Sequence, residues 1–257
     1  MRWTPLAGSK VTRARIVVVL GAFILLEALC RIGIIDRVTM IPPSEMVVAL
    51  WQLVAGGRFA GDIAFTAYNI VAAFLLSVLG GFVLGGLLHA LPRLRHVVEP
   101  LLSAYYAVPT FVFYPLLIVA FGVGRAPLIV IGAIFGIVVM IVHTILGLDH
   151  VPAAVIKSAA IMKLGGVRRY FLVMVPAATP HLVSGIKLAV AYSVIGVVAG
   201  EFILATEGIG KRISLAYDDF DNRTMYGLLL LLLIVVTCVN AGLSTWEKRL
   251  HRRFGLR

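Results

Sequence analysis

Four ionisable side chains lie inside long apolar stretches of the sequence: Glu27, His143, Lys187 and Glu201. An ionisable group at bilayer depth is costly, so it usually faces the protein interior, pairs with another group or reaches the surface. Catalysis inside a membrane would need acids, histidines or a nucleophile gathered at one place. Glu27, His143 and Glu201 are scattered over three of these stretches without motif spacing, so we predict no catalytic residue.

Each of these side chains has a structural alternative to a functional role. Glu27 can pair with Arg31, four residues later, near the outer interface. Lys187 can extend to the cytoplasmic surface, and His143 is expected to be a hydrogen-bonded packing residue. Glu201 leaves two possibilities open, because it could line the outer mouth of a pathway or bind a neighbouring loop.

The sequence predicts no cofactor or metal bound by this chain. Cys30 and Cys238 both lie inside apolar stretches, without the close spacing of a metal site. No Gly-x4-Gly-Lys-Ser/Thr segment occurs, and this segment is the usual phosphate-binding loop of ATPases. This chain is therefore not expected to hydrolyse ATP itself.

The elements that carry these residues are predicted to be transmembrane helices. The 257 residues are 61% hydrophobic and 14% charged, with a mean hydropathy of +1.02. About 20 apolar residues are needed to cross a bilayer core of about 30 Å. We therefore predict an all-α polytopic membrane protein with six spans, which are Ile16–Ile35, Ala64–Leu88, Val97–Phe121, Pro127–Leu148, Leu182–Leu204 and Tyr226–Leu243.

The distribution of basic residues predicts that both termini are cytoplasmic. With that orientation the inner segments carry more than twice as many Lys and Arg residues as the outer ones. The formal net charge of +11 therefore reflects membrane topology, and we predict no nucleic-acid partner. The expected organisation is a cytoplasmic segment over residues 1–15, a transmembrane domain over 16–245 and a basic tail over 246–257.

Three features of the transmembrane domain carry further expectations. The outer segment 36–62 is expected to form a short amphipathic helix, with Ser44 as its N-cap and Trp51 at headgroup depth.

Four glycines in the second span allow close helix packing, either within one subunit or between subunits. Aromatic residues surround a proline in the third span and could line a translocation pathway or belong to the core. The glycines are Gly80, Gly81, Gly85 and Gly86, and the candidate pathway residues are Tyr105, Tyr106, Pro109, Phe111, Tyr114 and Glu201.

The connection from residue 149 to residue 180 is too apolar for a disordered linker. Its sequence predicts a helix over Ala153–Leu164, a break at Gly165-Gly166 and a second helix over Arg168–Val175. Pro176 and Pro180 are expected to mark the entry to the fifth span. The apolar side chains of this cytoplasmic segment must be buried, either against the helix bundle or in a groove on a partner.

Several short motifs, in order along nearly the whole chain, resemble the permease subunits of binding-protein-dependent ABC importers, in the nitrate, sulfonate and taurine branch. Each motif is short, and the resemblance depends on their order and spacing. They are Ile41-Pro42-Pro43-Ser44-Glu45, Gly80-Gly81-x3-Gly85-Gly86, Glu99-Pro100-Leu101-Leu102, Ala107-Val108-Pro109, Pro115-Leu116-Leu117-Ile118, Phe121-Gly122-Val123-Gly124, Val175-Pro176-Ala177-Ala178-x-Pro180, Gly185-Ile186-Lys187-Leu188-Ala189, Val198-Ala199-Gly200-Glu201-Phe202 and Gly208-Ile209-Gly210.

In that family the cytoplasmic segment carries a Glu-Ala-Ala-x3-Gly signature, whose helix docks on the ATPase subunit. Counting back from Pro176 without gaps places Lys157 at the acidic position and Lys163 at the glycine. This chain therefore departs from the signature at both positions. The residues that the resemblance assigns to ATPase coupling are Ile156, Lys157, Ser158, Ala159, Ala160, Ile161, Met162, Lys163, Gly165 and Gly166.

The resemblance implies a type I importer permease in the bacterial inner membrane. It also implies ABC ATPase subunits that carry ATP and Mg, a second permease copy, expected to be identical, and a periplasmic or lipid-anchored solute-binding protein. The alternative function is an ion-coupled secondary transporter, although the inverted repeats of that class are not evident between the two halves.

Overall fold

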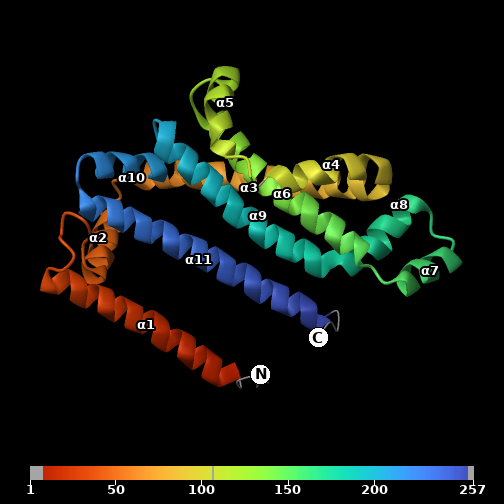
Figure 1. Ribbon diagram of the computed structural model, residues 1–257, viewed down its shortest axis with the longest axis horizontal. Coiled ribbons are helices and arrows are strands. Elements are labelled where there is room, and N and C mark those ends of the chain that lie inside the picture. Colours follow the sequence, from red (N-terminus) through yellow and green to blue (C-terminus); the bar gives the residue numbers. More distant parts are fainter. Residues whose placement is uncertain (1–7, 106, 254–257) are drawn as a thin grey trace. The chain divides into compact units, whose positions relative to one another are not determined.

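All regular secondary structure in the described part of the chain is helical. The computed structural model describes the backbone of residues 8–105 and 107–253. The helices before the middle of the chain are α1 (Gly8–Ile32), α2 (Pro43–Ala55), α3 (Ala60–Ala90), α4 (Pro92–Tyr105), the 3-10 helix η1 (Thr110–Phe113), α5 (Tyr114–Phe121) and α6 (Arg125–Asp149). They are followed by α7 (Ala153–Ile161), α8 (Gly166–Arg169), the π-helix η2 (Tyr170–Met174), α9 (Val175–Leu204), α10 (Ile209–Asp218) and α11 (Asn222–Arg253) (Figure 1).

These helices form two compact units. The first contains the chain up to Ala60 together with Arg212–Leu233, and the second contains Gly61–Lys211 together with the chain from Ile234 onward. The second unit holds most of the residues for which the sequence predicts a function. Each unit is described separately below.

The second unit is built around α6 and α9, which lie side by side (Figure 1). Glycines bring the two backbones together, since a Cβ atom placed on Gly196 would lie 2.7 Å from the Cα of Gly132. A Cβ on Gly136 would likewise lie 2.9 Å from the Ser193 hydroxyl. Small residues at helix contacts are typical of membrane proteins, where close van der Waals packing holds helices together.

Helix α3 packs against α6 through the predicted glycine motif. A Cβ on Gly81 would lie 2.8 Å from the carbonyl oxygen of Ile137, and one on Gly85 would lie 2.9 Å from that of Ile141. The buried Ser77 hydroxyl donates to a carbonyl oxygen and lies 3.3 Å from the Ser193 hydroxyl. The glycines thus pack within one subunit, as the first of the two alternatives predicts.

Four described helices are long and apolar enough to cross a membrane: Ala60–Ala90, Arg125–Asp149, Gly166–Ile203 and Asn222–Glu247. They contain four of the six predicted spans. The first predicted span overlaps α1, which is not among these four helices, and it stays a prediction. The fifth prediction is wrong at its start, because the helical path begins at Gly166 and Pro180 lies inside α9.

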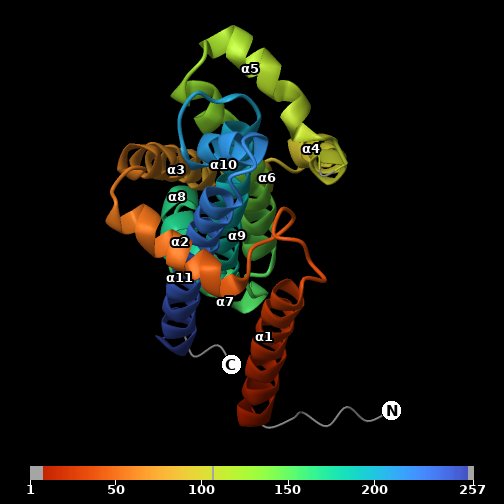
Figure 2. The ribbon, with the colours of Figure 1, turned by 90° about the vertical axis from the view of Figure 1, so that its left-hand side faces the viewer.

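The third predicted span is broken. Helix α4 and the segment Thr110–Phe121 differ in direction by 100°, and they would make a fifth crossing only as a bent pair. Pro109 directly precedes η1 in an extended conformation, and proline disfavours helix in the residue before it. Figures 1 and 2 both show α5 directed away from α3, α6 and α9.

In the first unit, Glu27 joins α1 to α2. Its carboxylate forms an ion pair with Arg31 at 2.6 Å, as predicted. It also accepts hydrogen bonds from the Ser44 backbone N–H at 3.0 Å and hydroxyl at 2.7 Å. The prediction of Ser44 as N-cap is wrong, because Pro42 precedes the helix and Ser44 lies in its first turn. The Glu27 carboxylate therefore satisfies a free N–H group at the start of α2.

Helix α11 begins within the first unit, at a capped end. The Asp221 carboxylate accepts a hydrogen bond from the Thr224 backbone N–H at 3.1 Å, the position of an N-cap contact. Burial alone would raise the pKa of Asp221, but its hydrogen bonds to Thr224 and Arg223 outweigh burial and lower it. Asn222 and Tyr226 donate to backbone carbonyls of residues 37–39, which ties α11 to the loop after α1.

We predict that Gly136→Val destabilises the second unit by about 2–3 kcal/mol, because the added methyl groups overlap Ser77 and Ser193. Thermal unfolding of the detergent-solubilised chain measures this effect. Gly242→Val is the matched control, since a Cβ there meets nothing within 4 Å. Equal unfolding temperatures for the two variants would contradict the packing of α3, α6 and α9.

Candidate functional site

Two regions of the second unit carry the predicted functional residues, and the first surrounds Glu201. This side chain has no solvent exposure within the chain. Its carboxylate accepts hydrogen bonds from the Thr66 hydroxyl at 2.8 Å, the Asn69 amide at 3.4 Å and the Gly210 N–H at 3.1 Å. With Asp62, which accepts from the Gly208 N–H at 3.0 Å, these groups form what we call the Glu201 cluster.

Two glycines let the loop after α9 fold against Glu201. Gly208 has a φ of +107°, a conformation that side chains rarely adopt, and a Cβ there would lie 2.5 Å from the Glu201 carboxyl carbon. A Cβ on Gly210 would lie 2.7 Å from the Glu201 Cβ. The Ile209 N–H donates to the Thr66 hydroxyl at 2.8 Å, so three successive backbone N–H groups bind side chains of this cluster.

Of the two alternatives for Glu201, the structure favours binding of a neighbouring loop. Sequence reasoning missed its partners Asp62, Thr66 and Asn69. Their spacing of four and three residues places them on one face of α3, where a polar stripe in an apolar helix could have indicated them. A role for Glu201 at the mouth of a pathway stays a prediction.

The predicted pathway aromatics lie on both sides of the break in the third span. The Tyr105 hydroxyl donates to the Ile134 carbonyl at 3.0 Å, while Phe111 stacks on Phe135 with ring centroids 4.9 Å apart. Tyr114 is buried against Leu128 and other core residues. Tyr106 lies outside the described residues, and Pro109 is exposed.

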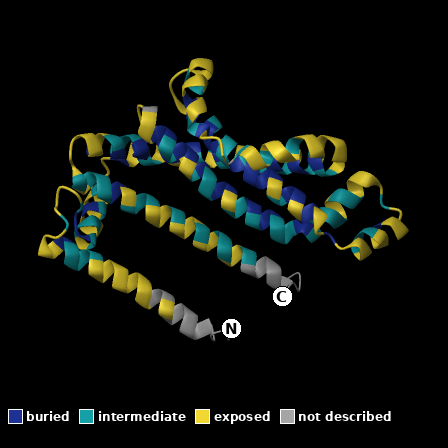
Figure 3. Cartoon of the chain, in the orientation of Figure 1, coloured by how far each residue is buried: buried dark blue, intermediate teal, exposed yellow. Residues whose placement is uncertain are grey.

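The second region is the predicted coupling segment, where α7 has one packed side and one free side. Val155, Ile156 and the buried Ala159 face the bundle, where the first two pack against a cluster that includes Leu148 and Leu182. Ile161 is 82% exposed and Met162 is 71% exposed, and we call these two residues the α7 tip. Exposed residues dominate α7 in Figure 3. Burial against the bundle, one of the two alternatives from the sequence, therefore applies to one side of α7, and burial in a groove on a partner stays a prediction for the other side.

Helix α7 ends earlier than the sequence predicts. Its last residue is Ile161, and Lys163 turns the chain with a φ of +53°, before Gly165-Gly166 is reached. The Lys163 N–H donates to the Ala160 carbonyl and the Leu164 N–H to the Ala159 carbonyl, which closes the last turn. A left-handed residue just after a helix is usually glycine. Lys163 is also the position where the family signature has its glycine.

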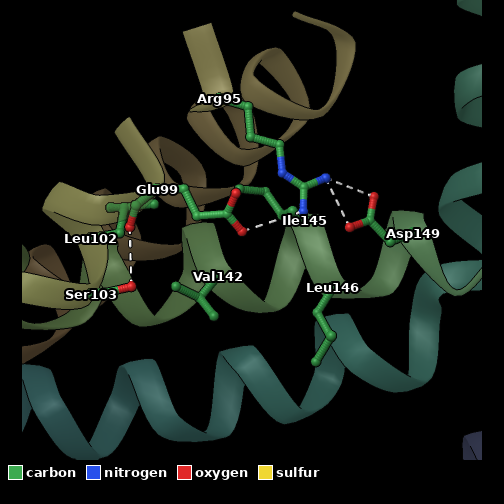
Figure 4. Close-up of a pocket in the computed structure, with 8 residues that line it drawn as sticks. All are labelled: Arg95, Glu99, Leu102, Ser103, Val142, Ile145, Leu146 and Asp149. Atoms are coloured by element: carbon green, nitrogen blue, oxygen red, sulfur yellow. Dashed lines mark hydrogen bonds and ion pairs between the residues drawn. The ribbon is translucent and has the colours of Figure 1, made fainter. Parts of the chain in front are cut away.

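A charged contact joins α4 to Asp149, the last residue of α6, four residues before α7 begins. Figure 4 shows this contact. Arg95 forms an ion pair with Asp149 at 2.8 Å and lies 3.6 Å from Glu99. His89, at the end of α3, lies 3.0 Å from the same Asp149 carboxylate. Arg95, Glu99 and Asp149 border a groove of about 340 Å³. The contacts of Asp149 with Arg95 and His89 connect the ends of α3, α4 and α6.

The remaining intramembrane charges also have partners. Lys187 forms an ion pair with Glu247 of α11 at 2.7 Å, and Glu247 also accepts from the Ser184 hydroxyl at 3.2 Å. The pair is partly buried, and the extension of Lys187 to the cytoplasmic surface stays a prediction. The His143 ring lies 2.9 Å from the Val139 carbonyl, one turn earlier, as expected for a packing histidine.

Comparison with known proteins identifies the class to which this fold and these motifs belong. Residues 77–256 match the family described as "Binding-protein-dependent transport system inner membrane component". The chain belongs to this family, and it is an inner-membrane permease component of an ABC importer.

Individual relatives support the same class. A probable ABC transporter permease protein of Haemophilus influenzae is 30% identical over 68% of this chain and 71% of its own length. The taurine transport system permease protein TauC of Escherichia coli is 24% identical over 82% of this chain and 78% of its own length. The nitrate import permease protein NrtB of Leptolyngbya laminosa is 24% identical over 77% of this chain and 75% of its own length.

A solved structure shares the fold. An inward-facing structure of the MetNI methionine ABC transporter contains a chain that superposes with a TM-score of 0.63 at 19% identity. The match covers 75% of this chain and 95% of that chain. The expectation of a type I importer permease fold is confirmed, and the family assignment replaces the alternative of a secondary transporter.

We predict that Glu201→Ala destabilises the second unit by roughly 3 kcal/mol, because the Gly210 N–H and the Thr66 hydroxyl lose a buried acceptor. Glu201→Gln keeps one acceptor oxygen, and its new amide can donate to the buried Asn69 oxygen, which has no partner. It should therefore unfold close to the parent temperature. Exposed Glu207→Ala is the control, and a parent-like Glu201→Ala would contradict the cluster.

For α7, we predict that Lys163→Gly stabilises the last turn by about 0.5–1 kcal/mol, because glycine adopts a positive φ without a steric cost. Slower hydrogen exchange at the amides of residues 162–164 would show it. Lys157→Gly, in the interior of the same helix, should cost about 1 kcal/mol and speed exchange. The same direction of change in both variants would contradict the left-handed helix end.

Proposed function

We propose that this permease is coupled to a separate ABC ATPase through the α7 tip. The exposure of Ile161 and Met162 carries the proposal, because two large adjacent apolar side chains at the end of a surface helix favour a protein contact. A short helix whose apolar end enters a groove on a partner is a common mode of recognition. The departures at Lys157 and Lys163 leave this apolar pair in place.

The other side of α7 supports the proposal, since it connects the tip to the bundle. Ile156 packs onto the core cluster that contains Leu148, near the end of α6, and Leu182 of α9. A displacement of the tip would therefore be transmitted to the two helices that form the centre of the second unit. Among the coupling residues proposed from the sequence, Ile156 and Ala159 would anchor the helix, and the α7 tip would bind the partner.

The wider assembly is proposed on the family's general design. Two copies of the chain would form the pathway, the ATPases would carry ATP and Mg, and a binding protein would deliver solute to the outer face. Segment 1–15, the loop after α6 and the tail 246–257 would be cytoplasmic, as the Lys and Arg distribution predicts. Relatives named for taurine, nitrate and aliphatic sulfonates favour a small polar solute.

For the pathway itself we propose the region of the α4–α5 break. Helix interruptions at membrane depth occur where backbone lines a cavity or is buried in protein. Pro109 is exposed at this break, and Tyr105 and Phe111 flank it. Tyr106, Tyr114 and Glu201 complete the proposed set, with Tyr114 and Glu201 acting as buried support for the wall rather than as contacts to solute.

Co-purification tests the coupling proposal. The tagged chain is solubilised with its partner subunits, and the ATPase retained per chain is measured. We predict that Ile161→Asp combined with Met162→Asp lowers retention at least tenfold, because two charges would replace the apolar contact. Ala153→Asp, at the exposed first position of α7, adds a charge at the opposite end and should leave retention unchanged.

Two results would contradict the proposal. Retention of the ATPase by the double variant would show that the tip is not the contact, and an equal loss in Ala153→Asp would show that any charge on α7 disrupts binding. The unfolding temperature of each solubilised variant separates a lost contact from a misfolded chain.

A further inference from the structure

A large apolar groove lies between the end of α3 and the segment α8–η2. Its volume is about 680 Å³. Val83 and Leu87 of α3 are exposed along one wall, and Val167 and Phe171 are exposed along the other. Both walls belong to helices that are long and apolar enough to cross a membrane. Helices of this kind lie among lipids, so an acyl chain is an available occupant for the groove.

Local backbone features form the groove. A Cβ on Gly86 would overlap the Tyr170 hydroxyl, so this glycine allows η2 to approach α3. Tyr170 also packs near Phe82, with ring centroids 6.3 Å apart, and against Phe171 at 5.0 Å. The π-helical turn Tyr170–Met174 interrupts the regular helix at this place, and such turns are frequent at binding sites.

One basic side chain of the groove, Arg169, makes no ion pair or hydrogen bond with the residues that the structure describes. Arg169 lines it, and its Nε atom is shielded from solvent and has no hydrogen-bond partner among the described residues. The other basic group, His89, already contacts Asp149 at 3.0 Å. An unpaired guanidinium beside apolar helices is costly, so an acceptor from outside the chain would stabilise it.

We propose that this groove binds an anionic phospholipid, with an acyl chain along the apolar walls and the phosphate at Arg169. The apolar side chains of the two walls suit an acyl chain, and the guanidinium complements the charge of a phosphate, to which it can donate two parallel hydrogen bonds. Basic pockets between helices near a membrane surface are typical sites for anionic headgroups. The proposal depends on the membrane placement of α3 and α9 but not on the coupling role of the α7 tip.

Lipid retention by the chain alone tests the site, without any ATPase. The chain is purified in mild detergent from bacterial membranes, and phosphatidylglycerol per chain is measured by mass spectrometry. Arg169→Gln should lower the retained phosphatidylglycerol about fivefold, and Arg169→Lys should retain more than Arg169→Gln. Arg168→Gln removes the same charge from the neighbouring residue, which is exposed and does not line the groove, and should change retention less than twofold.

A second variant tests the apolar wall. Val83→Trp should fill the groove and lower retention while Arg169 stays in place. Undiminished phosphatidylglycerol in Arg169→Gln, or an equal loss in Arg168→Gln, would overturn the proposal. In a separate preparation of the chain with its ATPase, an Arg169→Gln variant that keeps its lipid but loses the ATPase would also overturn the proposal, because the groove would then bind protein. Failure of the α7-tip variants to release the ATPase would leave the lipid measurement unaffected.

Discussion

The close approach of three helix backbones is the contact on which the second unit depends. Gly132, Gly136 and Gly196 lie where α6 meets α9, and Gly81 and Gly85 lie where α3 meets α6. In a bilayer, burying an apolar side chain against another helix gains little over leaving it in lipid. Dispersion contacts between closely spaced backbones, with hydrogen bonds such as those of Ser77, must hold the helices together instead.

This packing places two different structures on the same three-helix core. Asp62, Thr66 and Asn69 near the start of α3 meet Glu201 near the end of α9, so the loop after α9 is held by buried hydrogen bonds. Near the opposite ends of α3 and α9, the core cluster around Leu148 anchors α7. A core of interlocking backbones deforms little, so a force applied at α7 would move the helices together.

Hydropathy predicted α3, α6 and most of α9 and α11 well, because length and apolar content decide whether a helix can cross a bilayer. Hydropathy predicted the third span as one helix, but the chain bends beside Pro109. It also placed the start of the fifth span at Leu182, whereas the helical path begins at Gly166. The partners of Glu201 were missed because they are distant in sequence. For Lys163, the sequence was informative. Counting back from Pro176 placed it at the glycine of the family signature, and the structure gives it the positive φ that glycine adopts most easily.

Site-directed crosslinking of the assembled transporter tests the central claim most directly. A cysteine is introduced as Met162→Cys, in a background where Cys30 and Cys238 are replaced, and is treated with a short bifunctional reagent. The account predicts an adduct with the ATPase subunit, formed at a rate that changes when ATP is added, and no adduct from Ala153→Cys. No adduct from Met162→Cys in a complex that contains the ATPase would contradict the account.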